Sequence, residues 1–294
     1  MEKEMISKGF GFHFPVITGN NISRVWALRK AGLGVLSNMP GNSKPVPVIE
    51  DTAVRPEDLP EYIKEFDKIL SKYKLSCVYY AHIGSGELHL RPVMNLKDPE
   101  HIKLFRILGL ETAKLVKKYK GSLSGEHGDG RLRGEFIPLM LGDKIYSVFE
   151  DLKKIWDPVN ILNPGKIIGT PPMNTSFRYN TGHSKIKFAT EFDYSRVGGI
   201  LAATEKCTGS GDCLKSDIIG GTMCPSYMAT RDEKNSTRAR ANILREYLSE
   251  PKGSTGNNIE DVFEVFKLCL SCKACKSECP SSVDVAKLKA EFLQ

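Results

Sequence analysis

The chain has 294 residues, of which 40% are hydrophobic and 26% charged, the balance of a globular protein long enough for two domains. No apolar run is long enough to cross a bilayer and no secretory signal opens the chain, so we expect a cytoplasmic protein, with a peripheral position at the inner membrane face as the alternative. The net charge of +7 is spread among acidic residues rather than gathered in a basic block, which argues against a nucleic-acid partner.

Residues 1–168 alternate helical and strand-like patterns. Apolar residues recur at helical spacing over 59–73 and 101–119, and the apolar run 77–84 between them is predicted to be a strand. Residues 135–158 are expected to form a further helix that a proline ends. We therefore predict an α+β domain with an antiparallel sheet and helices on one face.

The rest of the chain divides into a linker and a helical region. Residues 169–195 are polar, poor in aliphatic side chains and open on a Pro-Pro pair, so we expect a linker. Beyond it, residues 196–294 are predicted to form a small all-α domain that depends on cofactors for its core, with helices over 236–250, 260–272 and 280–294.

Seven of the eight cysteines lie after residue 206, whereas Cys77 stands alone in an apolar run and is expected to be a buried thiol. Residues 269–280 contain the pattern C-x2-C-x2-C-x3-C-P. Three thiolates at this spacing can hold one cubane iron–sulfur cluster, while the cysteine before the proline binds the other cluster of a pair. A zinc site would need only two cysteine pairs.

A second group of cysteines completes the pair of clusters. Residues 207–213 read CTGSGDC, with Ser210 where a middle cysteine would stand, and a Cys-Pro pair follows at 224 and 225. A crossed assignment gives one [4Fe–4S] cluster the ligands Cys224, Cys269, Cys272 and Cys275. The other cluster, [4Fe–4S] or [3Fe–4S], receives Cys207, Cys213 and Cys279.

Two segments of the first domain carry histidines among glycines, AHIGSGELHLRP (81–92) and SGEHGDGRLRG (124–134). His82 and His89 would face opposite sides of a straight strand, but the glycines between them allow a tight reversal. Together with Glu126 they could form a divalent metal site with open positions. The alternative is that each histidine is an ordinary loop or core residue.

Two cations near the start of the chain are candidates for holding a carboxylate. Arg29 lies in RVWALRKAGLG (24–34) and Lys44 lies in PGNSKP (40–45). An arginine can grip a carboxylate through a bidentate fork. On these residues alone, ordinary surface cations are an equally good interpretation.

Five motifs occur in a fixed order: the WALRKAG segment, the lysine loop, the H-x-G-x-G-x-x-H segment, the GEHGDGRLRG segment and IWDPVNILNPGKII (155–168). This order resembles the C-terminal cap of FAD-linked oxidases, the family of D-lactate, glycolate and D-2-hydroxyglutarate dehydrogenases. Residues 197–294 are similar to the helical two-cluster ferredoxin domain of succinate and glycerol-3-phosphate dehydrogenase iron–sulfur subunits.

The resemblance implies a ferredoxin-like cap over a flavin, with zinc or manganese on His82, His89 and Glu126 and with His127 as the catalytic base. It implies that Arg29 and Lys44 hold the substrate carboxylate. It also implies that the NPGK ending returns the chain to the flavin and contributes the cofactor-side residues Asn163, Pro164, Gly165 and Lys166.

The sequence departs from the family pattern inside the histidine motif. Ser85 and Glu87 replace the usual Asp and Asn, which puts the metal's identity and affinity in question, and Arg91 stands where an Asn is common, which would make the substrate pocket more cationic.

The chain is expected to be a fragment of a larger flavin and iron–sulfur dehydrogenase. Its expected partners are a small 2-hydroxyacid, an FAD-binding domain or subunit, and a quinone or protein electron acceptor. An electron-transfer module with a non-catalytic cap is the alternative, and a metal-dependent hydrolase is a third hypothesis that leaves the seven cysteines unexplained.

Overall fold

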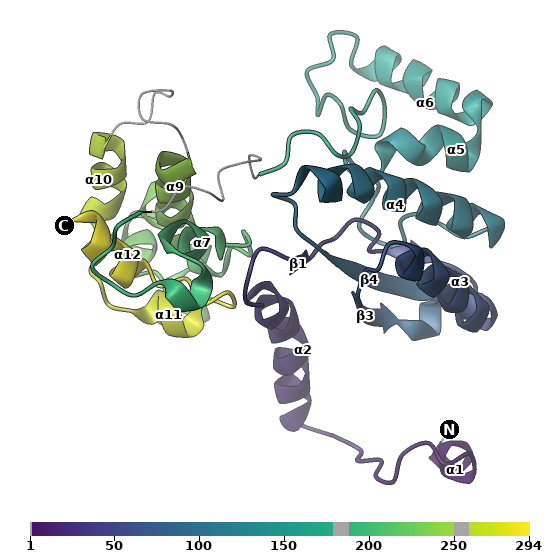
Figure 1. Ribbon diagram of the computed structural model, residues 1–294, viewed down its shortest axis with the longest axis horizontal. Helices are drawn as coiled ribbons and strands as arrows, with labels where there is room; N and C mark the ends of the chain where they lie inside the picture. Colours follow the sequence, from purple (N-terminus) through teal and green to yellow (C-terminus); the bar gives the residue numbers. More distant parts are fainter. Residues whose placement is uncertain (1, 179–187, 250–258) are drawn as a thin grey trace.

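The computed structural model describes residues 2–178, 188–249 and 259–294. Within them the chain builds two hydrophobic cores. One draws its buried residues from Val46 to Met173 and the other from Tyr194 to Leu288. Figure 1 shows the first part as a sheet with helices packed on it and the second part as a cluster of short helices.

The sheet of the first part is antiparallel and centres on β4 (Glu87–Met94). Strand β3 (Cys77–His82) pairs along one side of β4 as a hairpin. Two short strands, β1 (Lys44–Pro45) and β2 (Thr52–Ala53), pair with opposite ends of its other side. This mixture of helices and antiparallel sheet confirms the predicted α+β class.

The two faces of β4 differ because neighbouring side chains on a strand point to opposite sides. Leu88, Leu90 and Met94 are buried in the first core, whereas Glu87 and His89 alternate with them and so lie on the opposite face. The apolar face is covered by helices, as Figure 1 shows. The other face is therefore free to carry polar groups.

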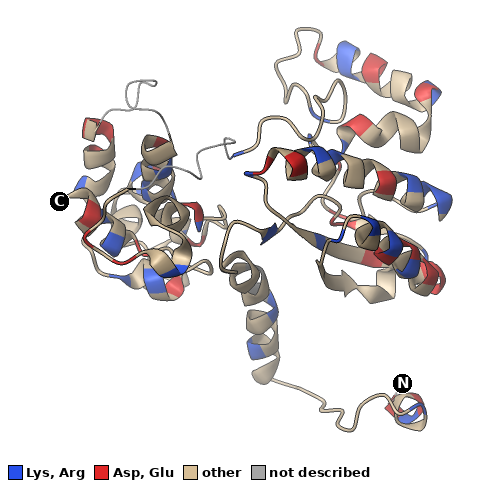
Figure 2. Cartoon of the chain, viewed as in Figure 1, with Lys and Arg blue, Asp and Glu red and all other residues tan. Residues whose placement is uncertain are grey.

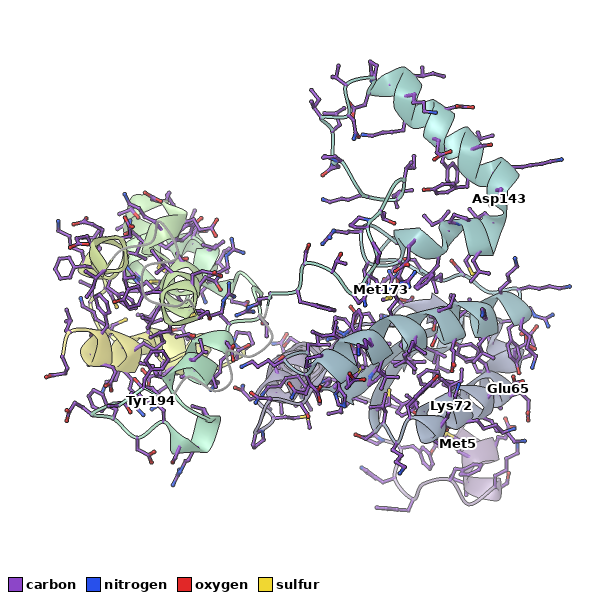
Figure 3. The ribbon with its side chains drawn as sticks, turned by 45° about the horizontal axis from the view of Figure 1, so that its top comes forward. Met5, Glu65, Lys72, Asp143, Met173 and Tyr194 are labelled. Carbon is purple, nitrogen blue, oxygen red and sulfur yellow. The ribbon has the colours of Figure 1, made fainter. Side chains whose placement is uncertain are left out.

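The covering helices are α3 (Leu59–Lys72) and α4 (Pro99–Lys118), both close to the predicted bounds. In α3, buried apolar side chains recur every four residues, which places one stripe against the sheet. Ion pairs link the two helices at their exposed edges, from Lys72 to Glu111 and from Lys118 to Glu65, each at 2.6 Å. Figure 3 labels Glu65 and Lys72 on this side of the molecule.

The single helix predicted over 135–158 is wrong, because the structure breaks it at Gly142. A 3-10 turn, η3 (Gly134–Phe136), leads into α5 (Ile137–Leu141), and α6 (Asp143–Trp156) follows. Gly142 has φ of +83°, a left-handed conformation that glycine adopts without strain. The turn folds α5 back against α6.

Helix α2 (Asn21–Ser37) projects from the body of the molecule, and α1 (Glu2–Ser7) lies beyond it at the N-terminal end. Helix α2 carries basic but no acidic residues, as the blue segments in Figure 2 show. Its C-terminal end contacts the second part, since a Cβ atom on the buried Gly34 would lie 2.4 Å from the Pro280 carbonyl oxygen.

Within residues 188–249 and 259–294, the second part contains helices and turns but no strand. Its core joins Leu244, Val262, Phe266 and Leu288. The helices are α7 (Ile200–Glu205), α8 (Pro225–Thr230), α9 (Thr237–Ser249), α10 (Ile259–Lys267), α11 (Ala274–Glu278) and α12 (Val285–Phe292). Among the described residues, further 3-10 turns are η1 (Pro56–Asp58), η2 (Ile83–Ser85), η5 (Ser195–Val197), η6 (Asp212–Leu214), η7 (Asp217–Ile219) and η8 (Glu233–Asn235).

The predicted linker packs against both cores where it is described. Met173 is buried in the first core and Tyr194 in the second, and Figure 3 labels both. Its central stretch, 179–187, lies outside the described residues, as does the last residue of the helix predicted over 236–250. No helix in the described ranges combines the length and apolarity that spanning a membrane requires.

Candidate functional site

The β3–β4 hairpin brings the two predicted histidine ligands together. The register pairs His82 with Glu87 and Tyr80 with His89, so all four side chains lie on the polar face of the sheet. The reversal depends on Gly86, which has φ of +76° and where a Cβ atom would lie 1.8 Å from the Val54 carbonyl oxygen. The rings of the two histidines are 5.2 Å apart.

Four side chains on this face could share a metal ion: His82, Glu87, His89 and Glu126. One ligand atom from each lies within 4.8 Å of the others. The sequence motifs predict three of these four residues, His82, His89 and Glu126. Glu87 stands out in the sequence only as a departure from the family pattern. The signal that could have found Glu87 is the hairpin register, because the residue opposite His82 must share its face.

The environment of the four donors fits a divalent cation. Among the described residues, Glu87 Oε1 and His89 Nδ1 are buried with no hydrogen-bond partner. A buried polar atom without a partner is costly unless a ligand satisfies it. Two imidazoles and two carboxylates are a donor set that zinc or manganese accepts. Burial raises the pKa of Glu87 and lowers the pKa of His89, so both shifts favour the neutral group when no cation is bound.

The loop that carries Glu126 and His127 is held by Asp51, a residue that the sequence analysis did not identify. Asp51 is fully buried and accepts hydrogen bonds from the backbone N–H groups of Glu126 and His127, both at 2.9 Å, and from the Ser124 hydroxyl. Burial acts to raise its pKa, but these donors outweigh burial and hold the pKa at about 2. Arg133 pairs with the same carboxylate at 3.3 Å. Asp51 therefore positions the loop as a permanent anion.

His127 lies beside the four donors and stays accessible. Its Nε2 atom is 3.3 Å from Glu126 Oε1, its ring stacks on His89 at 5.3 Å, and its side chain is 45% exposed. Arg29 reaches the same place from α2, with Nη2 3.3 Å from His82 Nε2. An imidazole, a guanidinium and a candidate metal site thus share one surface.

The structure does not bring Lys44 to this surface. Lys44 pairs with Met94 at the far end of β4, five residues from His89, which is about 16 Å along a strand. Its Nζ donates to the Met39 carbonyl oxygen, and burial lowers its pKa. Glu50 forms an ion pair with Arg91, so the positive charge that Arg91 was expected to add to the substrate pocket is neutralised.

The NPGK segment runs beside the loop of His127. The N–H of Ile167 donates to the Gly130 carbonyl oxygen at 2.9 Å, and Lys166 Nζ donates to Asn163 Oδ1 at 3.1 Å. The segment begins after α6, where the Asp157 carboxylate accepts hydrogen bonds from the backbone N–H groups of Ile161 and Leu162. All four predicted cofactor-side residues, Asn163, Pro164, Gly165 and Lys166, are exposed or half-buried in this segment.

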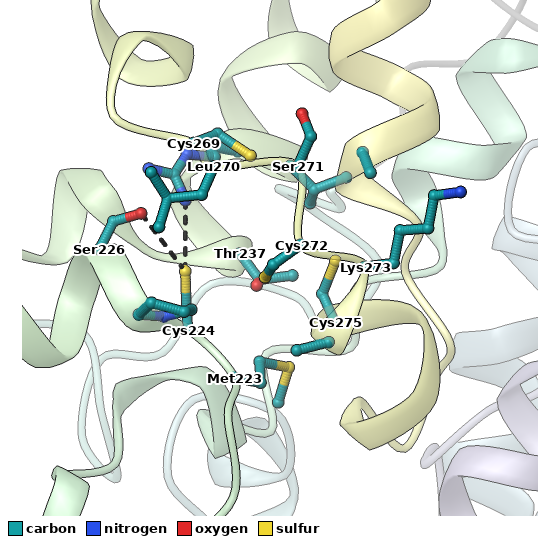
Figure 4. A pocket seen from close by; sticks show the side chains of 15 residues that line it. Met223, Cys224, Ser226, Thr237, Cys269, Leu270, Ser271, Cys272, Lys273 and Cys275 are labelled. Atoms are coloured by element: carbon teal, nitrogen blue, oxygen red, sulfur yellow. Dashed lines mark hydrogen bonds between the residues drawn. The ribbon is translucent and has the colours of Figure 1, made fainter.

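A second candidate site lies in the helical part. Cys224 lines one cavity together with three cysteines from 45 to 51 residues further along the chain, Cys269, Cys272 and Cys275. Figure 4 shows the four sulfur atoms turned toward a common space. Burial raises the pKa of the Cys275 thiol to about 11, so a bare thiol keeps its proton and a metal would have to displace it.

The other three cysteines lie nearby in the second core. Cys207 and Cys213 are buried and Cys279 is half-buried. The chain after Cys207 runs beside the chain after Cys279, since the hydroxyls of Thr208 and Ser281 lie 3.3 Å apart. Ser210 is exposed. Cys77 is set apart from both groups, half-buried in the first part, where burial raises its pKa to about 12.

Comparison with known proteins gives the class first. The sequence of residues 3–167, which builds the antiparallel sheet and its histidine–carboxylate cluster, matches the family model of the C-terminal domain of FAD-linked oxidases. A model of a 4Fe-4S dicluster domain matches residues 206–284. The chain belongs to the family of FAD-linked oxidases, through their C-terminal domain, and carries a 4Fe-4S domain after it.

Three relatives illustrate the likeness. D-2-hydroxyglutarate dehydrogenase of Pseudomonas putida is 32% identical over 307 aligned positions, which cover 93% of this chain and 30% of the relative. The same enzyme of Escherichia coli is 30% identical, again over 93% of this chain and 30% of the relative. Glycolate oxidase subunit GlcD of Bacillus subtilis is 27% identical over 52% of this chain and 32% of the relative. The chain thus spans about a third of the length of these relatives.

Proposed function

We propose that the chain supplies the substrate-binding cap and the iron–sulfur region of an FAD-dependent 2-hydroxyacid dehydrogenase. The observation that carries this proposal is the meeting of His82, Glu87, His89 and Glu126 on one face of the sheet, with His127 and Arg29 beside them. The matched relatives act on D-2-hydroxyglutarate by name, and others are named for glycolate and D-lactate. A small 2-hydroxyacid is the substrate class that we infer.

The four clustered side chains would hold the divalent cation, zinc or manganese. A metal bound there supplies Lewis-acid polarisation, the flavin of the complete enzyme supplies a hydride acceptor, and iron–sulfur clusters supply one-electron carriers. Glu87 and His89 are the buried ligands and fix the site, while His82 and Glu126 lie at its exposed edge.

The roles of the neighbouring groups follow from their positions. Arg29 would grip the substrate carboxylate, since its guanidinium already lies 3.3 Å from His82. His127 would take the proton of the substrate hydroxyl, because it is exposed next to Glu126 and its loop is anchored by Asp51. We place Lys44 outside this set, because it lies at the other end of β4.

The helical part would act as a two-cluster, helical ferredoxin-like domain. Its cavity supports a [4Fe–4S] cluster held by Cys224, Cys269, Cys272 and Cys275. Cys207, Cys213 and Cys279 would hold a second cluster, [4Fe–4S] or [3Fe–4S]. Six of these seven cysteines are at least partly buried within one core, which supports two centres placed close together.

The proposed partners are an FAD-binding domain or subunit and a quinone or protein electron acceptor, at a cytoplasmic site or at the inner membrane face. An exposed apolar stripe on α6 supports the first of these partners, because it directly precedes the NPGK segment. Its residues are Ile145, Val148, Leu152, Ile155 and Trp156.

The metal site is tested on the chain itself by direct measurement of bound zinc and manganese. Glu87→Gln and Glu126→Gln should each weaken binding at least about 10–100-fold, the loss that removal of even an outer partner of a metal site causes. Glu100→Gln, which alters an exposed carboxylate of α4 paired with Lys103, is the matched control and should bind as the wild type does. Equal metal content in all three variants would contradict the proposal.

A further inference from the structure

Arg240 is a buried cation at the edge of the four-cysteine cavity. It belongs to α9, and its side chain is among the largest fully buried ones, at 1% exposure. Its Nη1 atom lies 3.3 Å from Cys224 Sγ, a contact drawn as a dashed line in Figure 4, and its Nε donates to the Val265 carbonyl oxygen at 3.0 Å. Its Nη2 atom has no hydrogen-bond partner in the described parts of the chain.

The charge of this guanidinium is not balanced by any carboxylate that the described residues provide. No ion pair joins Arg240 to an acidic side chain there, and its guanidinium contacts a neutral carbonyl and a thiol. A buried charge without a counter-ion is strongly unfavourable. The cavity beside it is lined by the groups that would become anions on binding iron, the sulfur atoms of Cys224, Cys269, Cys272 and Cys275.

A second arginine of the same helix shows the contrast. Arg238 lies two residues earlier, and its backbone N–H donates to Cys213 Sγ at 3.4 Å. Its guanidinium, however, pairs with Glu233 and is partly exposed, so its charge is already compensated. The start of α9 therefore touches both cysteine groups, but only Arg240 brings an uncompensated charge.

We propose that Arg240 is a positioning residue that raises the reduction potential of the cluster in this cavity through its contact with Cys224. The inference rests on the iron–sulfur assignment made above. Reduction adds one negative charge to the cluster, and a buried cation in contact with a ligand sulfur stabilises that charge more than it stabilises the oxidised form. Hydrogen bonds to the sulfurs and local charge are the established means by which a protein sets such potentials.

The experiment is a redox titration of the anaerobically reconstituted chain, followed by low-temperature EPR. Arg240→Gln keeps a donor but removes the charge, and it should lower the equilibrium constant for reduction at least tenfold, which is about 59 mV for a one-electron couple. Arg240→Lys keeps the charge and should stay within that tenfold limit. Arg238→Gln, the matched control, removes a compensated charge and keeps the backbone contact to Cys213, so the potential should stay at the wild-type value.

The outcomes separate the two levels of inference. A wild-type chain that takes up no iron and sulfide would contradict the proposed function. A wild-type chain that binds clusters, with an Arg240→Gln potential equal to the wild-type value, would overturn the role of Arg240 alone. If the glutamine variant fails to hold its cluster, Arg240→Lys decides: a potential near the wild-type value supports the charge effect, and a tenfold drop refutes it.

Discussion

Burial at the sheet surface shifts the pKa values of two side chains in the proposed metal site. Burial raises the pKa of Glu87 and lowers the pKa of His89, so without a cation the pair is held neutral. His89 is then ready to bind as a neutral imidazole, whereas Glu87 must lose a proton first. Binding of a cation is therefore coupled to proton release from one identified residue.

This coupling predicts a pH dependence. Because the pKa of Glu87 is raised, protons compete with the metal over a wider range than for an ordinary carboxyl, so affinity should fall as the pH is lowered through that raised pKa. Metal titrations at a series of pH values measure the effect. Glu87→Gln should bind weakly throughout and lose this part of the dependence; an unchanged pH profile in that variant would mean that another group titrates.

His127 is predicted to be the catalytic base. In the complete dehydrogenase that we propose, His127→Ala should lower kcat by about 10²–10⁴-fold, which is the usual size of general-base effects. His101→Ala is the control, since His101 accepts a backbone hydrogen bond from Asn95 at the start of α4 and lies apart from the donors. A folded His127→Ala enzyme with wild-type turnover would rule out the role.

Ser210 is predicted to leave the second cluster one ligand short. A hydroxyl is a poor iron ligand because its pKa lies far above that of a thiol, and Ser210 is exposed, so the corner iron should be lost easily. The oxidised protein should then show the EPR signal of a three-iron cluster. Ser210→Cys should supply the missing thiolate and abolish this signal, whereas Ser210→Ala should leave it. A silent wild-type protein containing the iron of two cubanes would contradict the prediction.

At the level of single elements, the sequence predicted what local periodicity determines. Apolar spacing located α3 and α4, and the apolar run located β3. The break at Gly142 was missed, because helical spacing continues on both sides of one glycine whose conformation is set by the packing of α5 against α6. Periodicity describes a segment and does not report where it turns.

The sequence predicted only part of the candidate metal site, because local patterns do not report contacts made by the fold. His82, His89 and Glu126 follow from motif letters, whereas Glu87 requires the hairpin register. Asp51 could not have been identified from the sequence, because it is a single acidic residue that lies 75 positions before Glu126. Its carboxylate accepts a hydrogen bond from the Glu126 backbone N–H. Contacts of such long sequence separation depend on the tertiary fold.

The hairpin turn is the element on which the site depends, and its two glycines make a controlled test. Gly86→Ala would place a Cβ atom against the Val54 carbonyl oxygen and strain a left-handed residue, which should cost about 1–3 kcal/mol of unfolding free energy and weaken metal binding. Gly84→Ala meets no atom within 4 Å and should stay within about 0.5 kcal/mol of the wild type. Denaturant unfolding measures both, and equal stabilities would show that the turn tolerates a side chain.

Across the whole molecule, the two cores must keep a fixed relation if electrons are to pass between their sites. The contacts that join them include the packing of Gly34 of α2 on Pro280 and the ion pair between Lys97, just before α4, and Glu205 at the end of α7. The second contact joins side chains that are 10% and 11% exposed at 2.6 Å. An ion pair that is this well shielded is screened less than a surface pair.

The pair of Lys97 and Glu205 should therefore couple the stabilities of the two parts. Glu205→Gln removes the carboxylate that Lys97 contacts and Lys97→Met removes the ammonium group that Glu205 contacts, so each should destabilise the chain, and the double variant should cost less than the sum of the two. The expected coupling free energy is about 0.5–3 kcal/mol, measured as a double-mutant cycle from denaturant unfolding. Lys103→Met and Glu100→Gln, an exposed pair within α4, form the control cycle and should give at most about 0.5 kcal/mol. Strict additivity of the Lys97 and Glu205 variants would mean that this ion pair does not couple the stabilities of the two parts.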